Sequence, residues 1–80
     1  MKANEVQHGA VVRVRSPLSG VGGMLCLGEH LDNRREDAVG RIFACLTQES
    51  NQTMLVFVRH GDTEAVYWAH ELEMLGTPTS

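Results

Sequence analysis

The sequence predicts an all-β domain built around a small antiparallel sheet. The main evidence lies between Val39 and Leu75, where strand-length apolar runs are separated by short polar turns. These runs are rich in β-branched and aromatic residues, which favour strands. A chain of 80 residues forms one domain. We expect an ordered core over about residues 9–75 and flexible ends at 1–8 and 76–80.

A first strand is expected within Ala10–Arg15, where two valines alternate with two arginines. Such alternation is typical of a strand with one buried face. Pro17 ends the strand, because proline has no N–H to donate to a sheet. The segment Leu18–Asp37 follows, and its four glycines are expected to prevent a helix and leave a long loop. Loops of this length are uncommon in small domains and are often functional.

Three more strands are expected at Val39–Leu46, Thr53–Arg59 and Thr63–Trp68, with a tight hairpin turn between the last two. The short stretch Ala69–Leu72 suits a single 3₁₀ turn. A brief last strand, Glu73–Leu75, then completes a five-stranded antiparallel barrel with a long loop after its first strand.

Charge and cysteine content exclude several classes of function. The net charge of −3 argues against broad nucleic-acid binding, which needs clustered basic residues. The adjacent Arg34 and Arg35 have acidic neighbours and are expected to form a solvated, self-compensating loop. Cys26 and Cys45 lie in apolar settings and are expected to be buried, reduced thiols. With no apolar run of membrane length and no secretory signal, a cytoplasmic protein is expected.

No motif in the sequence indicates catalysis. The two His-x-Asp sequences, at His30 and His60, fall in expected loops, where aspartate serves turn formation. Neither a third metal ligand nor a nucleophile with its base has helpful spacing. We therefore predict no catalytic residue, no metal and no cofactor.

The apolar residues of the third and fourth strands raise a packing problem. Tyr67 and Trp68 are adjacent, so they point to opposite faces of the sheet. Leu55 and Phe57 likewise oppose the face that carries Val56. A small barrel has one interior, so some of these side chains must lie outside it. An exposed apolar patch usually marks an interface.

Three ways of covering this patch remain open. Burial in a homo-oligomer is favoured, a different protein partner is the second possibility, and folding of the 18–37 loop over the patch is the third. Arginine is enriched at interfaces, so Arg59 is expected at the rim. The predicted contact residues are Phe57, Arg59, Tyr67 and Trp68 on the sheet, with His30, Arg34 and Arg35 from the loop.

The order of the elements resembles that of SH3-like barrels over most of the chain. The landmarks are Gly9-Ala-Val-Val-Arg-Val, Gly40-Arg-Ile, Val56-Phe-Val and Val66-Tyr-Trp-Ala-His-Glu-Leu-Glu. The chain also resembles short uncharacterised bacterial proteins carried on mobile gene cassettes.

The ending is similar to that of the small plasmid-borne type II dihydrofolate reductases. The stretch nearest to their Val-Gln-Ile-Tyr run is Glu64-Ala-Val-Tyr67, in which the tyrosine and its aliphatic neighbour match and Ala65 stands in place of the glutamine. This resemblance implies a site formed between subunits, with Val66 and Tyr67 facing a shared cavity.

From these observations the expected function is a small self-associating binding module in the bacterial cytoplasm. The first alternative is a small-molecule-binding protein or enzyme whose site forms between subunits. The second is a nucleic-acid-binding barrel that uses its arginines: Arg13, Arg15, Arg34, Arg35 and Arg41.

Overall fold

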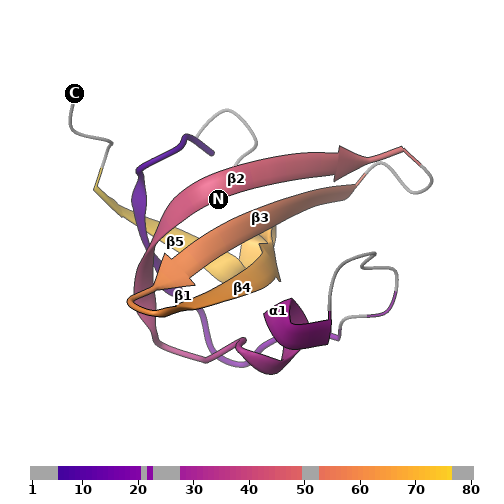
Figure 1. The fold of residues 1–80 in the computed structure, drawn as a ribbon, viewed down its shortest axis with the longest axis horizontal. Coiled ribbons are helices and arrows are strands. Elements are labelled where there is room, and N and C mark those ends of the chain that lie inside the picture. Colours follow the sequence, from indigo (N-terminus) through magenta and orange to yellow (C-terminus); the bar gives the residue numbers. More distant parts are fainter. Residues whose placement is uncertain (1–5, 21, 23–27, 50–52, 77–80) are drawn as a thin grey trace.

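The structure is a computed structural model that describes residues 6–20, 22, 28–49 and 53–76. It confirms the predicted fold class, with five antiparallel strands in one sheet and a 3₁₀ turn before the last strand (Figure 1). The elements are β1 (Val11–Val14), α1 (Gly28–Asp32), β2 (Val39–Gln48), β3 (Thr53–His60), β4 (Thr63–Trp68), η2 (Ala69–Glu71) and β5 (Leu72–Gly76).

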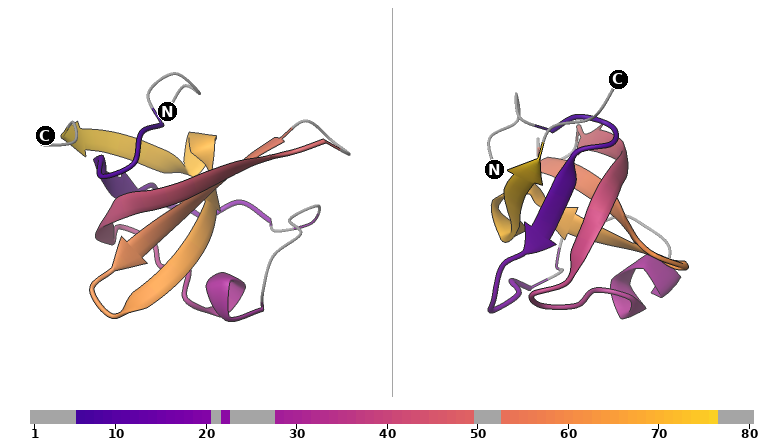
Figure 2. Two further views of the ribbon diagram at one scale, coloured as in Figure 1. Left: turned by 45° about the horizontal axis from the view of Figure 1, so that its top comes forward. Right: turned by 90° about the vertical axis from the view of Figure 1, so that its left-hand side faces the viewer.

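The strands follow the order β4-β3-β2-β1-β5, so the first strand lies between the second and the last. Figure 2 shows this arrangement in its right-hand view, with β1 flanked by β2 and β5. The first and last strands of the chain pair with each other, and Val14 of β1 lies opposite Leu72 of β5. The sheet curves strongly, so that its inner face closes around one core.

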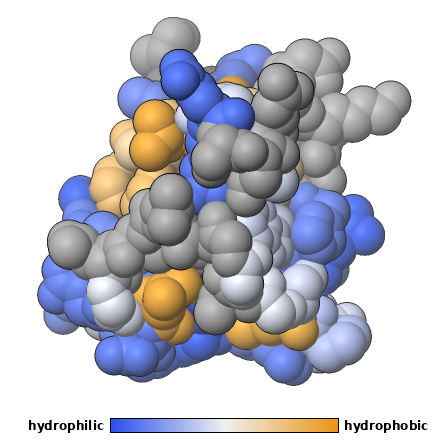
Figure 3. All heavy atoms as spheres, turned by 90° about the vertical axis from the view of Figure 1, so that its right-hand side faces the viewer, coloured by the Kyte–Doolittle hydropathy of each residue, from blue (hydrophilic) through white to orange (hydrophobic). Residues whose placement is uncertain are grey.

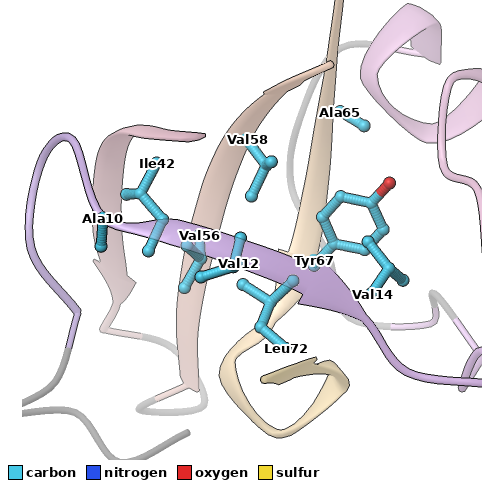
Figure 4. Close-up of a cluster of buried hydrophobic side chains, with 9 residues drawn as sticks. All are labelled: Ala10, Val12, Val14, Ile42, Val56, Val58, Ala65, Tyr67 and Leu72. Atoms are coloured by element: carbon cyan, nitrogen blue, oxygen red, sulfur yellow. The ribbon is translucent and has the colours of Figure 1, made fainter. Parts of the chain in front are cut away.

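The core is formed by the inward side chains of every strand (Figure 4). Tyr67 is the largest of these side chains and is fully buried, with its ring beside Val14 of β1. Val6, which precedes β1, packs against the same core. The members of the cluster are Ala10, Val12, Val14, Ile42, Val56, Val58, Ala65, Tyr67 and Leu72.

The register settles which face of the β3–β4 hairpin is inside. Val56 lies opposite Tyr67 and Val58 opposite Ala65, and all four belong to the core. The alternate residues therefore point outward. This outer face carries three cross-strand pairs: Leu55 with Trp68, Phe57 with Val66, and Arg59 with Glu64.

A β-bulge at Phe43 interrupts the pairing of β2 with β3. Ile42 lies opposite Val58, whereas Ala44 lies opposite Phe57, so Phe43 is the extra residue. Phe43 lies on the outer face, where its ring is 6.1 Å from that of Phe57. Beyond the bulge β2 extends past β1, and the end of the β2–β3 hairpin projects past Trp68, the last residue of β4 (Figure 1).

Two expectations about the long connection and the cysteines need correction. The segment Leu18–Asp37 contains a short helix, because Gly28 begins α1 and the four residues after it include no glycine. Cys45 is exposed rather than buried, since it lies on the projecting part of β2, beyond β1. Cys26 lies outside the described residues.

Gly40 is required by the close approach of β2 and β3. A Cβ atom at this position would lie 2.6 Å from the carbonyl oxygen of Arg59 and 2.6 Å from Cγ1 of Val58. The ring Nδ1 of His60 would be 2.8 Å away. Since real Cβ contacts are longer, any side chain here would push the two strands apart.

We therefore expect Gly40→Ala to lower the free energy of unfolding by about 1–3 kcal/mol, the usual cost of overpacking. Gly28→Ala is the matched control, because a Cβ there meets no atom within 4 Å. Urea unfolding followed by the fluorescence of Trp68 measures both variants. Equal stabilities for the two variants would contradict the close approach.

Candidate binding surface

The outer face of the β3–β4 hairpin is covered in part by the chain itself. Leu55 and Val66 form a second, smaller buried cluster beneath Leu31, Phe57 and Trp68. Leu31 belongs to α1, which packs against β4. The long connection therefore folds over the apolar patch, which was the third of the three possibilities left open by the sequence. We refer to residues 16–20 and 28–37 as the cover.

A buried ion pair fastens the cover to the end of the sheet. Nη2 of Arg34 lies 2.6 Å from Oε2 of Glu71, and the two side chains are only 4% and 1% exposed. The same carboxylate accepts hydrogen bonds from the backbone N–H groups of Ser19 (2.6 Å) and Trp68 (2.9 Å). The Glu71 charge is thus fully satisfied, which a buried carboxylate requires.

This ion pair corrects the expectation that Arg34 lies in a solvated loop. Its partner is 37 residues away in sequence rather than among the neighbouring acidic residues. The guanidinium also lies over the ring of Tyr67, 5.4 Å from its centroid. Arg35, in contrast, keeps an exposed side chain and contributes only its backbone N–H to the interior.

Further contacts hold the first part of the cover in place. The indole N–H of Trp68 donates to the carbonyl oxygen of Gly20 at 2.9 Å. The hydroxyl of Ser19 lies 2.8 Å from Nε2 of His70. Trp68 is therefore half-buried by its own chain, whereas the sequence analysis predicted that it contacts a partner.

The hydroxyl of Tyr67 connects the core to the cover. It accepts the N–H of Arg35 at 3.0 Å and lies 2.7 Å from Nε2 of His60. Nδ1 of His60 lies 2.9 Å from the carbonyl oxygen of Val39, which can only accept. A proton on Nδ1 of His60 satisfies this arrangement, because Nδ1 then donates to Val39 and Nε2 accepts the Tyr67 proton. Burial raises the pKa of Tyr67 above its ordinary value of 10.0.

His30 belongs to α1, and its side chain faces the sheet. Its ring meets that of Phe57 edge-on at 5.5 Å, and its Nε2 is 3.8 Å from Oε1 of Glu64. Nδ1 is buried and has no hydrogen-bond partner among the described residues. His30 therefore packs as part of the cover, and Phe57 is half-buried beneath it.

The predicted contact residues thus separate into three groups. Tyr67 and Arg34 are buried and do not reach the surface. His30, Phe57 and Trp68 are half-buried where the cover meets the sheet. Only Arg35 and Arg59 have exposed side chains, and Arg59 is paired with Glu64.

Apolar surface that the sequence reasoning missed remains open elsewhere. Val39, Leu46 and Leu75 are 53%, 55% and 48% exposed. Figure 3 views the side toward which the β2–β3 hairpin points, and separate apolar patches lie there among hydrophilic residues. An open groove of about 470 Å³ lies on the outer face of β1, β2 and β3. No pattern in the sequence marks Leu46, because its exposure depends on where β1 ends.

The described residues include no group of three or more His, Cys, Asp and Glu side chains placed to hold a metal ion. In the same part of the chain, no helix has the length and apolar character needed to cross a membrane. Comparisons with protein-family models, curated proteins and solved structures found no match.

We expect Glu71→Gln to destabilise the fold by about 3–5 kcal/mol, because it leaves the Arg34 charge buried without its counter-ion. Glu73→Gln is the matched control, since Glu73 pairs with Arg13 on the surface. Surface ion pairs contribute little, so its unfolding midpoint in urea should stay near that of the parent. Equal midpoints for both variants would show that the Arg34–Glu71 pair does not hold the cover.

The raised pKa of Tyr67 can be measured directly, because Tyr67 is the only tyrosine in the chain. Tyrosinate absorbance should give a midpoint above 10.0 in the folded protein and an ordinary one in urea. The stabilisation that comes from the buried, protonated Tyr67 is complete below the pKa of Tyr67 in the unfolded protein. It is lost as the pH rises through the pKa of Tyr67 in the folded protein. Tyr67→Phe should remove this alkaline loss of stability. A midpoint that is the same with and without urea would contradict the buried hydroxyl.

Proposed function

We propose that this chain is a small, non-enzymatic binding module that associates with a second copy of itself through the open edge of β2. The observation that carries the proposal is the length of that edge. β1 pairs with β2 only as far as Arg41, with two further backbone bonds at Ile42. From Phe43 to Gln48 no described strand pairs with this side of β2, and Leu46 is 55% exposed there.

The register indicates which backbone groups are available on the open edge. The two-residue turn at Gly61 and Asp62 makes His60 and Thr63 a hydrogen-bonded pair, and such pairs alternate along a ladder. Followed back along β3 in steps of two, this pattern leaves the residues in between to bond with β2. Ala44 and Leu46 lie opposite those in-between residues, so they direct their backbone groups toward β3. Cys45 and Thr47 therefore direct theirs away from the sheet.

An antiparallel pairing of two β2 edges about a two-fold axis would be self-complementary. With the axis at Leu46, Cys45 of each copy would exchange hydrogen bonds with Thr47 of the other. The two exposed Leu46 side chains would then meet at the centre. No residue from Phe43 to Gln48 is charged, so the two edges would approach without like-charge repulsion.

The composition of this edge supports the proposal. Proteins usually protect free edges from pairing with lysine, proline or inward charges. The projecting part of β2 has none of these, although a bulge at Phe43 precedes it. A proposal for self-association therefore remains, but its contact surface differs from the one that the sequence favoured.

Neither of the alternative functions has comparable support. The reductase resemblance implied that Val66 and Tyr67 face a shared cavity, yet both side chains are fully buried within one chain. Nucleic-acid binding would rely on arginines, but Arg34 is buried with Glu71, and Arg13 and Arg59 already pair with carboxylates.

We expect the parent protein to approach twice its chain mass of 8.8 kDa as its concentration rises, measured by light scattering after gel filtration. Leu46→Glu should keep it monomeric, because two buried charges would meet at the axis. Leu75→Glu is the control, since Leu75 is similarly exposed but lies on β5. A monomeric parent from micromolar to millimolar concentration would refute the proposal. So would equal masses for the two variants.

A further inference from the structure

The groove on the outer face of β1–β3 combines apolar and cationic groups. It encloses about 470 Å³. Val11 and Val39 supply its apolar surface, and the glycines Gly40 and Gly61 line it without side chains. Arg41 and Arg59 provide the charge. Its lining residues are Val11, Val39, Gly40, Arg41, Arg59 and Gly61.

The two arginines of the groove lie directly opposite each other on β2 and β3. Like charges in this position destabilise a sheet. Arg59 is compensated by Glu64, its cross-strand neighbour on β4, and its guanidinium also lies 5.0 Å from the centroid of the Phe43 ring. The charge of Arg59 is therefore neutralised, and its guanidinium is held in position.

Arg41 has no such compensation. Its Nη1 donates a hydrogen bond to the carbonyl oxygen of Gly9 at 3.0 Å, and no carboxylate of the described residues lies within ion-pair distance. A guanidinium has five N–H donors, so most of those of Arg41 have no partner among the described residues. A positive charge with no counter-ion in this part of the chain thus lies beside an exposed valine, in a chain whose net charge is −3.

We propose that this groove binds a small organic anion. The carboxylate of the ligand would bridge Arg41 and the free side of Arg59, and its apolar body would cover Val11 and Val39. Guanidinium groups bind carboxylates through paired, charge-assisted hydrogen bonds. An anion at this point would also remove the repulsion between the two arginines. A second copy of the chain fits this groove poorly, because a two-fold axis there would bring arginine toward arginine.

The proposal goes beyond self-association and uses a different part of β2. The groove involves Val39–Arg41, whereas the open edge extends from Phe43 to Gln48. Failure of either proposal therefore leaves the other standing.

The test is an NMR titration of the parent protein with three matched probes. 4-Phenylbutyrate carries both the charge and the apolar body, its primary amide carries only the body, and acetate carries only the charge. We expect saturable shifts of the Val11, Val39, Gly40 and Gly61 amides with 4-phenylbutyrate, and much weaker binding of the other two. Equal affinity for the amide or for acetate would overturn the proposal, as would the absence of saturable shifts with 4-phenylbutyrate.

Two substitutions locate the binding. Arg41→Gln should lower the affinity for 4-phenylbutyrate by at least about tenfold, the usual effect of losing a charge-assisted hydrogen bond. Arg15→Gln is the control, because it removes the same charge from an exposed side chain that does not line the groove. Similar affinities for these two variants would refute the assignment to the groove. Their urea midpoints show whether each variant is folded, and Arg41→Lys should bind with intermediate affinity if Gln disturbs the fold.

Discussion

The structure depends on one constraint: the β3–β4 hairpin is apolar on both faces, while the sheet encloses only one interior. The face with Val56 and Tyr67 fills that interior. The face with Leu55 and Val66 would be exposed if the connection after β1 were short, and the cover buries it instead. The Arg34–Glu71 ion pair makes this possible, because it fastens the cover to the turn that leads into β5.

The same arrangement determines which surface is left for partners. The cover protects the outer face on the side of β4, where α1 packs. The groove and the open edge lie on the side of β2, the groove before the bulge at Phe43 and the open edge after it, and they differ in chemistry. The groove offers arginine beside valine, whereas the edge offers unpaired backbone groups and one exposed leucine. A small anion and a second copy of the chain would therefore not compete for the same residues.

The strands could be predicted from the sequence because their signals are local. The alternation of valine and arginine predicted β1. The turn at Gly61 predicted the β3–β4 hairpin, and β4 has the expected limits of Thr63 and Trp68. The candidate site could not be predicted in this way. The partner of Arg34 is 37 residues away, and neither acidic residues near Arg34 nor apolar ones near Glu71 indicate it. The bulge at Phe43 and the short reach of β1 depend on tertiary packing, and they decide that Leu46 is exposed.

Backbone amide exchange measured at low and high protein concentration tests the account most directly. The amide of Ile42 donates to the carbonyl oxygen of Ala10 within one chain, so it should be protected at both concentrations. The amides of Cys45 and Thr47 should exchange rapidly when the protein is dilute and slowly when it is concentrated. Rapid exchange of both at every concentration would contradict a β2 edge that pairs between copies. Protection of both in the dilute protein would show that the edge is not open.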